Sequence, residues 1–409
     1  MKMKSKITKN HVVYLAILAS FFLVFCPEKS FGATATISTK PAVSPLEISG
    51  WIPYWRTATG TADAIAHINT FKEISPFGYT LKSDGTLFDA MKIESPEWQN
   101  LFKVAREKKV RIIPSITSGN GDLIDKIMRD PKLRKAHIVE IMAMVNKYNF
   151  DGVDLDYEGK KAETKNYFSL FLKELYKAAG KKFVICTIEP RTPLTDRFDK
   201  IPKDIQFAND FVEINKYCDR VRIMAYDQGL VDLRLNETAG GLYNPVADVR
   251  WVEKVIKLAM KDISKKKIVI GIPTYGHEYK VTPLSEGFKY DFLWSFNPKY
   301  GLNLALQYKL TPTRNQAGEL SIAYISTDTI STLEKESNTQ TNNVPIATTS
   351  ISTSATPNKY FGPSFNMMWW SDAKSIQDKV NLAKKLGVRG VAIFKIDGGE
   401  DPAMWNILK

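Results

Sequence analysis

The chain has 409 residues and a formal net charge of +13, with 44% hydrophobic and 25% charged residues. That balance is typical of a globular protein and excludes a chain that is disordered throughout. Its Lys and Arg residues are spread over many segments, which favours solvated helix faces over a nucleic-acid site, so we expect no nucleic-acid partner. We also expect the protein to be a monomer.

The first 33 residues have the three-part layout of a secretory signal peptide: four lysines, an apolar run at 12–25 and small residues at 32–35. The apolar run is shorter than the roughly 20 residues that cross a bilayer, which makes a membrane anchor the weaker interpretation. Removal of residues 1–33 takes away five Lys and one Glu and lowers the charge from +13 to +9. We expect a chain that is secreted or in the cell envelope, without a stable membrane partner, and an extended linker at 34–45.

From residue 47 onward, short β-branched and apolar runs alternate with amphipathic stretches, which is the pattern of a parallel sheet with crossover helices. Eight runs are predicted strands: Glu47–Tyr54, Ile68–Ser75, Val110–Ile116, Gly152–Tyr157, Phe183–Ile188, Val221–Tyr226, Ile268–Pro273 and Gly390–Ile396. Helices are predicted at Ser95–Lys108, Pro131–Lys147, Glu163–Ala179, Val246–Lys261 and Asp372–Leu386. Eight such units favour a closed (β/α)8 TIM barrel over an open sheet, and we assign it to residues 46–409.

The interval between the seventh and eighth predicted strands is longer than the others, at about 90 residues. We therefore expect a small α+β insertion at 276–368, with a strand-like segment at Ser321–Ser326. Inside it, the Ser/Thr/Asn-rich tract 327–358 has too few apolar residues to pack and is predicted to be flexible.

The most informative stretch is Asp151-Gly-Val-Asp-Leu-Asp-Tyr-Glu-Gly159. Alternate side chains of a strand share a face, so Asp154, Asp156 and Glu158 point one way and the intervening apolar residues point the other. The acidic set is expected to face the barrel axis near its C-terminal mouth, where barrel active sites lie. Repulsion among three carboxylates raises the pKa of at least one, which suits a proton donor to a glycosidic oxygen.

Two other interpretations compete. A calcium loop fits at Asp154–Gly159, but its twelfth position is Lys165 instead of a bidentate Glu. A solvated edge strand is disfavoured by the apolar residues Val153, Leu155 and Tyr157, which suit a strand with a buried outer face.

The stretch resembles the DGxDxDxE signature of glycoside hydrolase family 18, the chitinases and endo-β-N-acetylglucosaminidases, and matches it in full. Four further stretches agree, and the resemblance extends over residues 47–409: Gly50–Trp55, Ile74–Phe77, Met224–Asp227 and Gly271–Gly276. The resemblance implies an enzyme that hydrolyses β-linked N-acetylglucosamine glycans with net retention of configuration.

By the same resemblance, Glu158 is the general acid and then the base, while the 2-acetamido oxygen of the substrate attacks the anomeric carbon. Asp156 orients the acetamido group, Asp154 lies behind it and shares a proton, and Tyr226 hydrogen-bonds the acetamido carbonyl. Asp227, Met224, Tyr54 and Tyr275 are further candidate substrate-binding residues; for Tyr226 and Met224 the alternative is core packing. No metal or organic cofactor is implied.

One position departs from the family pattern. Members usually end the eighth strand with a Trp that floors the reactive subsite, whereas this chain has Phe394 there. Phe stacks on a sugar with less area, which leaves substrate preference open. Trp369 and Trp370 either line the cleft or belong to the core.

Several questions stay open at the level of sequence. The glycan is chitin or chito-oligosaccharide, or alternatively peptidoglycan, spore cortex or the core of N-glycans. The segments Trp370–Ala373 and Gly399–Pro402 resemble spore-wall hydrolases of the family. A non-catalytic chitin-binding lectin is the alternative of another class, although such proteins typically lose the acid at the position of Glu158. Cys186 and Cys218 are either free thiols or one disulfide.

Overall fold

The computed structural model of the chain describes residues 46–325 and 362–409, so the predicted signal peptide, the linker at 34–45 and the tract at 327–358 lie outside the described residues. Parallel strands follow one another in the order β1-β15-β9-β8-β7-β6-β5-β2, and pairing of β1 with β2 closes the ring. The predicted (β/α)8 barrel is confirmed. Its strands are β1 (Glu47–Pro53), β2 (Glu73–Leu81), β4 (Arg111–Ile112), β5 (Ser115–Ser118), β6 (Gly152–Tyr157), β7 (Phe183–Ile188), β8 (Arg220–Ile223), β9 (Ile268–Pro273) and β15 (Gly390–Phe394).

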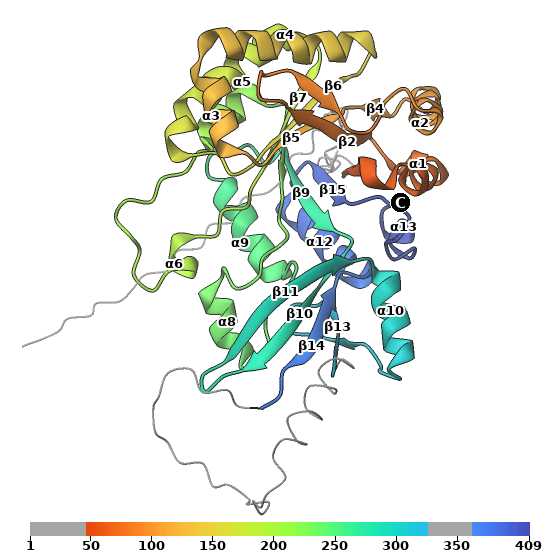
Figure 1. Cartoon of the computed structure of the whole chain (residues 1–409), viewed down its shortest axis with the longest axis vertical. Coiled ribbons are helices and arrows are strands. Elements are labelled where there is room, and N and C mark those ends of the chain that lie inside the picture. Colours follow the sequence, from red (N-terminus) through yellow and green to blue (C-terminus); the bar gives the residue numbers. More distant parts are fainter. Residues whose placement is uncertain (1–45, 326–361) are drawn as a thin grey trace, which may run out of the picture. The chain divides into compact units, whose positions relative to one another are not determined.

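Helices pack on the outer face of the barrel, as α4 and α5 do beside β6 and β7 (Figure 1). Acidic or amide side chains cap several of them: Asp130 at α4, Asp372 at α12 and Asn120 at α3 each accept hydrogen bonds from first-turn N–H groups. The longer helices are α1 (Thr57–Ala66), α2 (Pro96–Glu107), α3 (Gly121–Arg129), α4 (Pro131–Lys147), α5 (Lys165–Ala179), α9 (Val249–Ala259) and α12 (Ala373–Leu386). Shorter ones are α6 (Leu194–Arg197), α7 (Phe211–Tyr217), α8 (Leu233–Ala239) and α13 (Met404–Ile407).

The bounds of the second and third strands of the barrel differ from the prediction. The second strand was expected at Ile68–Ser75, but β2 begins at Glu73 and runs through Pro76 to Leu81. The third is divided at Pro114 into β4 and β5, with β3 (Leu87–Asp89) pairing antiparallel to the end of β2. Prolines such as Pro76 and Pro114 are expected to end a strand. Here the segments on both sides of each proline stay in the sheet, because they pair with neighbouring strands of the closed barrel.

The floor of the barrel is charged. Glu47 accepts hydrogen bonds from Arg220 (2.9 Å) and Arg389 (2.7 Å). Glu73 accepts from Arg111 (3.0 Å) and from the fully buried Arg222 (2.9 Å). Buried charges require such partners because an unpaired one carries a large desolvation cost. The network therefore holds in place the strands whose C-terminal ends form the mouth of the barrel.

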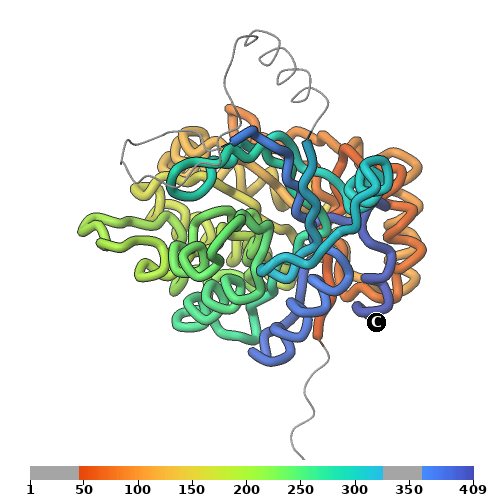
Figure 2. Tube along the Cα trace, turned by 90° about the horizontal axis from the view of Figure 1, so that it is seen from below, coloured from red at the N-terminus to blue at the C-terminus, as the bar shows by residue number. Residues whose placement is uncertain are grey.

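The expected insertion between the seventh and eighth barrel strands is present, and its described residues form a small antiparallel sheet and a helix (Figures 1 and 2). Its strand order is β11-β10-β14-β13-β12. The elements are β10 (Gly276–Pro283), β11 (Phe288–Phe296), α10 (Pro298–Gln307), β12 (Thr313–Arg314), β13 (Leu320–Tyr324) and β14 (Phe365–Trp370). Because β10 begins three residues after the C-terminal end of β9, the insertion is attached at the mouth of the barrel.

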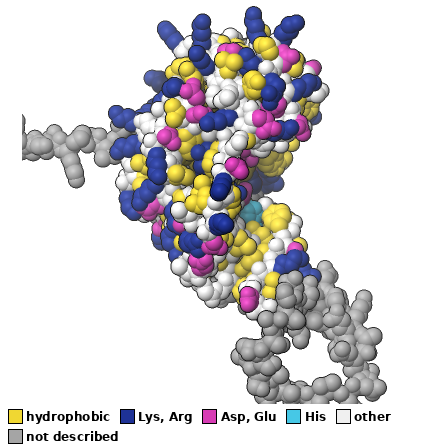
Figure 3. Space-filling model, turned by 90° about the vertical axis from the view of Figure 1, so that its left-hand side faces the viewer, with side chains coloured by type: hydrophobic (Ala, Val, Ile, Leu, Met, Phe, Trp, Pro, Cys, Tyr) yellow, Lys and Arg dark blue, Asp and Glu magenta, His cyan; other side chains and the backbone are white. Residues whose placement is uncertain are grey.

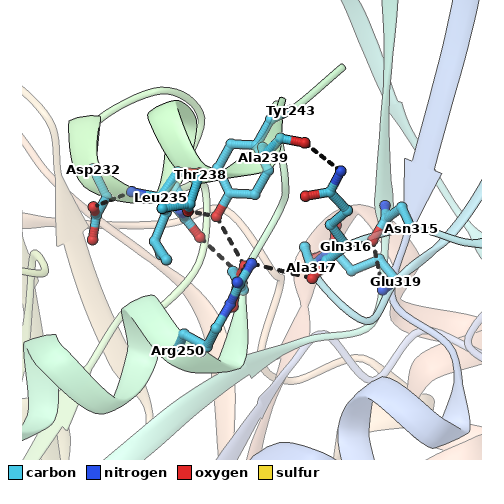
Figure 4. Close-up of polar contacts among 12 residues, drawn as sticks. Asp232, Leu235, Thr238, Ala239, Tyr243, Arg250, Asn315, Gln316, Ala317 and Glu319 are labelled. Carbon is cyan, nitrogen blue, oxygen red and sulfur yellow. Dashed lines mark hydrogen bonds and ion pairs between the residues drawn. The ribbon is translucent and has the colours of Figure 1, made fainter. Parts of the chain in front are cut away.

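Polar contacts hold the turn between β12 and β13 against the segment before α9 (Figure 4). The buried carboxylate of Glu319 accepts hydrogen bonds from the N–H groups of Val246 (3.1 Å) and Ala247 (2.6 Å). Arg250 donates to the carbonyl oxygen of Gln316 (3.1 Å). The inserted sheet and the barrel thus form one unit with shared contacts.

Cys186 on β7 and Cys218 after α7 form a disulfide, which answers the question left open by the sequence. On the face drawn in Figure 3, Lys and Arg are interspersed with Asp and Glu and do not gather in one patch. Among residues 46–325 and 362–409, no helix has both the length and the apolar character needed to span a bilayer.

Candidate active site

The alternation predicted for the acidic stretch is present on β6. Val153, Leu155 and Tyr157 are buried in the layer between barrel and helices, and the Tyr157 hydroxyl hydrogen-bonds His137 of α4 (2.6 Å). Asp154 and Asp156 lie on the opposite face of the strand, inside the barrel, and Glu158 follows directly at its C-terminal end. The three carboxyl groups therefore ascend the barrel axis toward the mouth.

Four donors surround the fully buried carboxylate of Asp154. Its Oδ2 accepts from Trp51 Nε1 (2.9 Å), Ser115 Oγ (2.6 Å) and Arg222 Nη1 (2.9 Å), and its Oδ1 accepts from Thr187 Oγ1 (2.7 Å). These donors come from β1, β5, β7 and β8. Such a set satisfies the hydrogen-bonding needs of a buried carboxyl group, and the proton sharing that the family resemblance implied for Asp154 stays a prediction.

Asp156, one step higher, has the opposite character. It is buried, and its Oδ1 has no hydrogen-bond partner among the described residues. Burial, together with the charges of Glu158 and Asp154, raises its pKa well above the usual value. A buried carboxyl with an unused oxygen is available to a ligand group that enters the barrel mouth.

Glu158 is half-buried at the mouth, and its backbone N–H donates to the carbonyl oxygen of Ser118 (2.8 Å). Burial is the main cause that raises its pKa, followed by the negative charges of Glu189 and Asp227, while Lys160 acts in the opposite direction. Glu158 thus keeps its proton to a higher pH than an exposed glutamate, which is the property required of a general acid near neutral pH.

Residues after β8 form the next part of the site. Tyr226 is buried, and burial raises its pKa, with Asp156 as the largest charge contribution. Asp227 has a left-handed backbone (φ 55°), and its Oδ1 accepts from the Tyr275 hydroxyl (2.6 Å) and contacts His277 Nε2 (2.8 Å). The side chain of Asp227 is still 56% exposed, so that its second oxygen faces the solvent side of the mouth.

Aromatic rings form a platform around Phe394 at the end of β15. Phe394 stacks on Tyr226 with ring centroids 5.6 Å apart and planes inclined by 16°. Trp51, Phe77 and Tyr275 contact it edge-on at 5.8, 6.0 and 6.1 Å. Phe394 is only half-buried, so the cluster offers an apolar surface to a sugar ring beside the carboxyl groups.

Not every predicted site residue joins this group. Tyr54 is 38% exposed, and its ring contacts that of Trp55. The Trp55 ring contacts Phe77, which in turn contacts Phe394, so Tyr54 is two rings away from the platform. Met224 is buried below Tyr226 and has little exposed surface. The structure thus brings together Asp154, Asp156, Glu158, Tyr226, Asp227, Tyr275 and Phe394.

Trp369 and Trp370 belong to the core, so their assignment to the substrate-binding set is corrected. Trp370 is fully buried in the inserted module, where Phe296 contacts its ring edge-on at 6.0 Å. A Cβ added at Gly276 would lie 2.4 Å from the Cβ of Trp370, which leaves no room for movement on that side. Trp369 faces the main core against Tyr243. Because 369 and 370 alternate along β14, each fills a different core and neither faces a groove.

Sequence reasoning missed several residues of the site. Trp51, Thr187 and Arg222 hold Asp154, and all three lie on the inward face of their strands. The same period of two that identified the acidic residues of β6 would have found them, had it been applied to the neighbouring strands. Glu189 and Lys160 carried no sequence signal, because their proximity to Glu158 depends on the register of β6 and β7 and on a loop conformation.

Metal ligation was not expected. Over the two described ranges, no group of three or more His, Cys, Asp or Glu side chains is arranged to hold a metal ion.

Known proteins resemble this chain in sequence and in fold. The sequence model of the family described as "Glycosyl hydrolases family 18" matches residues 51–399. The chain is 21% identical over 314 residues to the "Uncharacterized glycosylase YvbX" of Bacillus subtilis (strain 168), a match that covers 75% of this chain and 76% of that protein.

Two solved structures are similar in fold. The Bacillus cereus spore cortex-lytic enzyme SleL matches with a TM-score of 0.66 and 20% identity, over 89% of this chain and 73% of the other. A chitinase from Chromobacterium violaceum matches with a TM-score of 0.66 and 17% identity, over 89% of this chain and 98% of the other. At such identities the likeness concerns the fold alone.

Proposed function

Because this chain belongs to glycoside hydrolase family 18 and is therefore a glycosidase with a glycan substrate, we propose that it cleaves β-1,4-linked N-acetylglucosamine glycans with retention of configuration. Chitin or chito-oligosaccharides are the proposed substrate, with the reactive sugar seated on Phe394 and its acetamido group directed at Asp156 and Tyr226. Glu158 is the proposed acid and base.

In the first step, the proton of Glu158 moves to the glycosidic oxygen as the bond from that oxygen to the anomeric carbon breaks. The acetamido oxygen of the same sugar forms a bond to the anomeric carbon and gives a positively charged oxazolinium ring. Asp156 stabilises the N–H side of this ring, and the Tyr226 hydroxyl donates to the acetamido oxygen. In the second step, the Glu158 carboxylate takes a proton from water, which attacks the anomeric carbon and reopens the ring.

The observation that carries this proposal is the contrast between neighbouring carboxyl groups. Glu158 and Asp156 both have raised pKa values and no side-chain hydrogen bond among the described residues, whereas Asp154 is surrounded by donors. Groups whose environments differ in this way over a single strand are suited to separate acid and stabilising roles. The proposed roles follow that order along β6.

Replacement of Glu158 tests the proposal. Glu158→Gln removes the transferable proton with little change of shape, and kcat on an aryl N,N′-diacetylchitobioside should fall by about 10²- to 10⁴-fold, the usual contribution of a general acid or base. Glu163→Gln is the matched control, because this exposed glutamate lies five residues further on, and its turnover should equal that of the wild type. Undiminished turnover by Glu158→Gln would remove Glu158 from the proposed role.

A second candidate substrate is the glycan of peptidoglycan or spore cortex. It is favoured by the similarity in fold to a spore cortex-lytic enzyme and by the net positive charge, +9 after removal of residues 1–33, which suits an anionic wall. Initial rates on colloidal chitin, purified peptidoglycan and a high-mannose glycopeptide distinguish the candidates. A rate on peptidoglycan well above that on chitin would replace the first proposal by the second.

Export from the cytoplasm is part of the proposal. The Cys186–Cys218 disulfide supports it, since disulfides persist mainly in oxidising compartments. The predicted signal peptide at residues 1–33 supplies the route, and mass spectrometry of protein from the culture medium or the cell envelope tests it. Protein that retains residue 1 and stays in the cytoplasm would contradict this part.

A further inference from the structure

Glu189 lies beside the proposed acid although it is 31 positions away in the sequence. Strands β6 and β7 pair in parallel with Asp154 opposite Ile185 and Asp156 opposite Thr187. Continued by two residues, that register brings Glu158 opposite Glu189, and both follow the C-terminal ends of their strands. Glu189 also has the parity of Thr187, whose hydroxyl reaches Asp154 inside the barrel.

The carboxylate of Glu189 holds the backbone that follows Glu158. Its Oε1 accepts a hydrogen bond from the N–H of Gly159 (2.8 Å). Gly159 has a left-handed backbone (φ 63°), so the chain turns sharply at this residue. Since Gly159 N is one peptide bond from Glu158, this hydrogen bond fixes the direction in which the side chain of Glu158 leaves the strand.

Two further partners hold Glu189 in place. Asn209, in the segment before α7, donates to Oε2 (2.7 Å), and Lys160 Nζ lies 3.6 Å from the same oxygen. The side chain of Lys160 is 1% exposed and also donates to the carbonyl oxygen of Tyr157. Although burial acts to raise it, Lys160 and the N–H donors bring the pKa of Glu189 below its usual value, so the group stays ionised.

Charges from three strands of the barrel surround Glu158. Asp156 lies below it on β6, Glu189 beside it after β7, and Asp227 after β8; Lys160 is the cation of the group. Burial is the largest cause that raises the pKa of Glu158, and Glu189 is the largest contribution from any charged neighbour.

We propose that Glu189 is a positioning residue for Glu158, whose carboxylate fixes the turn at Gly159 and supplies the negative charge that keeps Glu158 protonated at the mouth of the barrel. The inference rests on the proposed role of Glu158 as acid. It assigns two separable functions to one side chain, a hydrogen-bond acceptor for the turn and a fixed charge for the acid.

The charge is tested with Glu189→Gln, which keeps an oxygen for the Gly159 N–H and removes the negative charge. Loss of that charge makes Glu158 release its proton at lower pH, so the alkaline limb of the kcat–pH profile should move down by about 0.5–1 pH unit with KM little changed. Glu163→Gln removes the same charge from an exposed position and should leave the limb in place. A limb within 0.2 pH unit of the wild type in Glu189→Gln would overturn the proposal.

The acceptor is tested with Glu189→Asp, which keeps the charge and shortens the side chain so that it no longer reaches Gly159. Here the alkaline limb should stay near that of the wild type while the plateau of kcat falls about tenfold, because a misplaced acid loses alignment. A limb that moves as far as in Glu189→Gln would contradict the separation of the two functions. A purely structural role would instead lower the unfolding midpoint of both variants and leave both limbs unchanged.

Failure of this inference is distinguishable from failure of the proposed function. If Glu158→Gln retains turnover, the role of Glu158 itself is wrong. If Glu158→Gln is inactive and the Glu189 variants match the wild type in limb and plateau, only the inference about Glu189 fails.

Discussion

Asp154 and Arg222 form a buried ion pair (2.9 Å) in the middle of the barrel, and neither side chain has any exposed surface. Arg222 also binds Glu73 and the hydroxyl of Ser75, and its guanidinium lies 4.8 Å from the centre of the Trp51 ring. One residue therefore connects the charged floor of the barrel to the acidic groups above it. Its removal leaves Asp154 buried without its cation and leaves Glu73 with Arg111 as its remaining partner.

Replacement of Arg222 is predicted to destabilise the fold. Arg222→Met should lower the free energy of unfolding by about 3–5 kcal/mol, the usual cost of breaking a buried pair by removing one partner. Arg129→Met is the control: Arg129 is 46% exposed and pairs with Asp125 on the surface of α3, so its loss should cost less than about 1 kcal/mol. Urea denaturation measures both, and equal losses in the two variants would contradict the structural role of Arg222.

Glu400 gives a prediction about pH. Burial, together with the neighbouring Asp63, raises its pKa to about 9 from an unfolded value of 4.5, so the folded state holds the proton more tightly. Its contribution to stability is therefore fully present below about pH 4.5 and is lost progressively as the pH rises toward 9.

The difference in unfolding free energy between wild type and Glu400→Gln isolates this effect, because all other groups are shared. That difference should fall between pH 5 and pH 9 by a few kcal/mol, since each pKa unit corresponds to about 1.4 kcal/mol. Thermal or urea unfolding at several pH values measures it. Parallel curves for the two proteins would show that Glu400 is not the group that titrates.

At the scale of elements, the sequence predicted the strands of the barrel and the helices α2, α4, α5, α9 and α12, and it misplaced strands in which local and tertiary preferences disagree. β6, β7, β9 and α4 have the predicted bounds. β2 does not have its predicted bounds. Ile68 is apolar because it packs in the core as part of a short 3-10 helix, and the strand begins only at Glu73 and includes Pro76. Helices α6 and α8 were missed because each is too short to show a helical period.

The disulfide is an element-scale constraint, since it ties β7 to the end of α7 immediately before β8. Its two cysteines are 32 positions apart, and closure of a loop of this size is worth about 3.7 kcal/mol by the chain-entropy account. Reductant should therefore lower the urea midpoint of the wild type. The double variant Cys186→Ala/Cys218→Ala should not respond, and a wild-type midpoint unaffected by reductant would contradict the pairing.

At the scale of the whole molecule, the fold and the acidic group of the site could be read from the sequence, whereas the surroundings of that group could not. Period-two spacing on a single strand is local information, and it placed Asp154, Asp156 and Glu158 on one face. Several contacts of the site join segments that are far apart in the chain. They are the hydrogen bonds to Asp154, the hydrogen bond from the Gly159 N–H to Glu189, and the contact of His277 with Asp227. Those contacts depend on the register and the closure of the barrel, which local patterns in a single sequence do not reveal.

The insertion illustrates the same limit. Its length predicted a separate module, but not that β10 would bring His277 to Asp227 at the mouth, nor that Trp369 and Trp370 would fill two cores. In a sequence, two adjacent aromatic residues just before a predicted helix look the same whether they line a groove or pack in a hydrophobic core. The side of β14 that each ring occupies follows only from pairing with β10 and β13.

In the proposed mechanism, the substrate's own acetamido group is the nucleophile, and Glu158 acts as the acid and then as the base. Proton NMR of the products formed in the first minutes of chito-oligosaccharide hydrolysis, before mutarotation, tests this claim most directly. Two displacements at the anomeric carbon predict that the new reducing ends appear as the β-anomer. Initial appearance of the α-anomer would mean a single displacement by water and would contradict the mechanism.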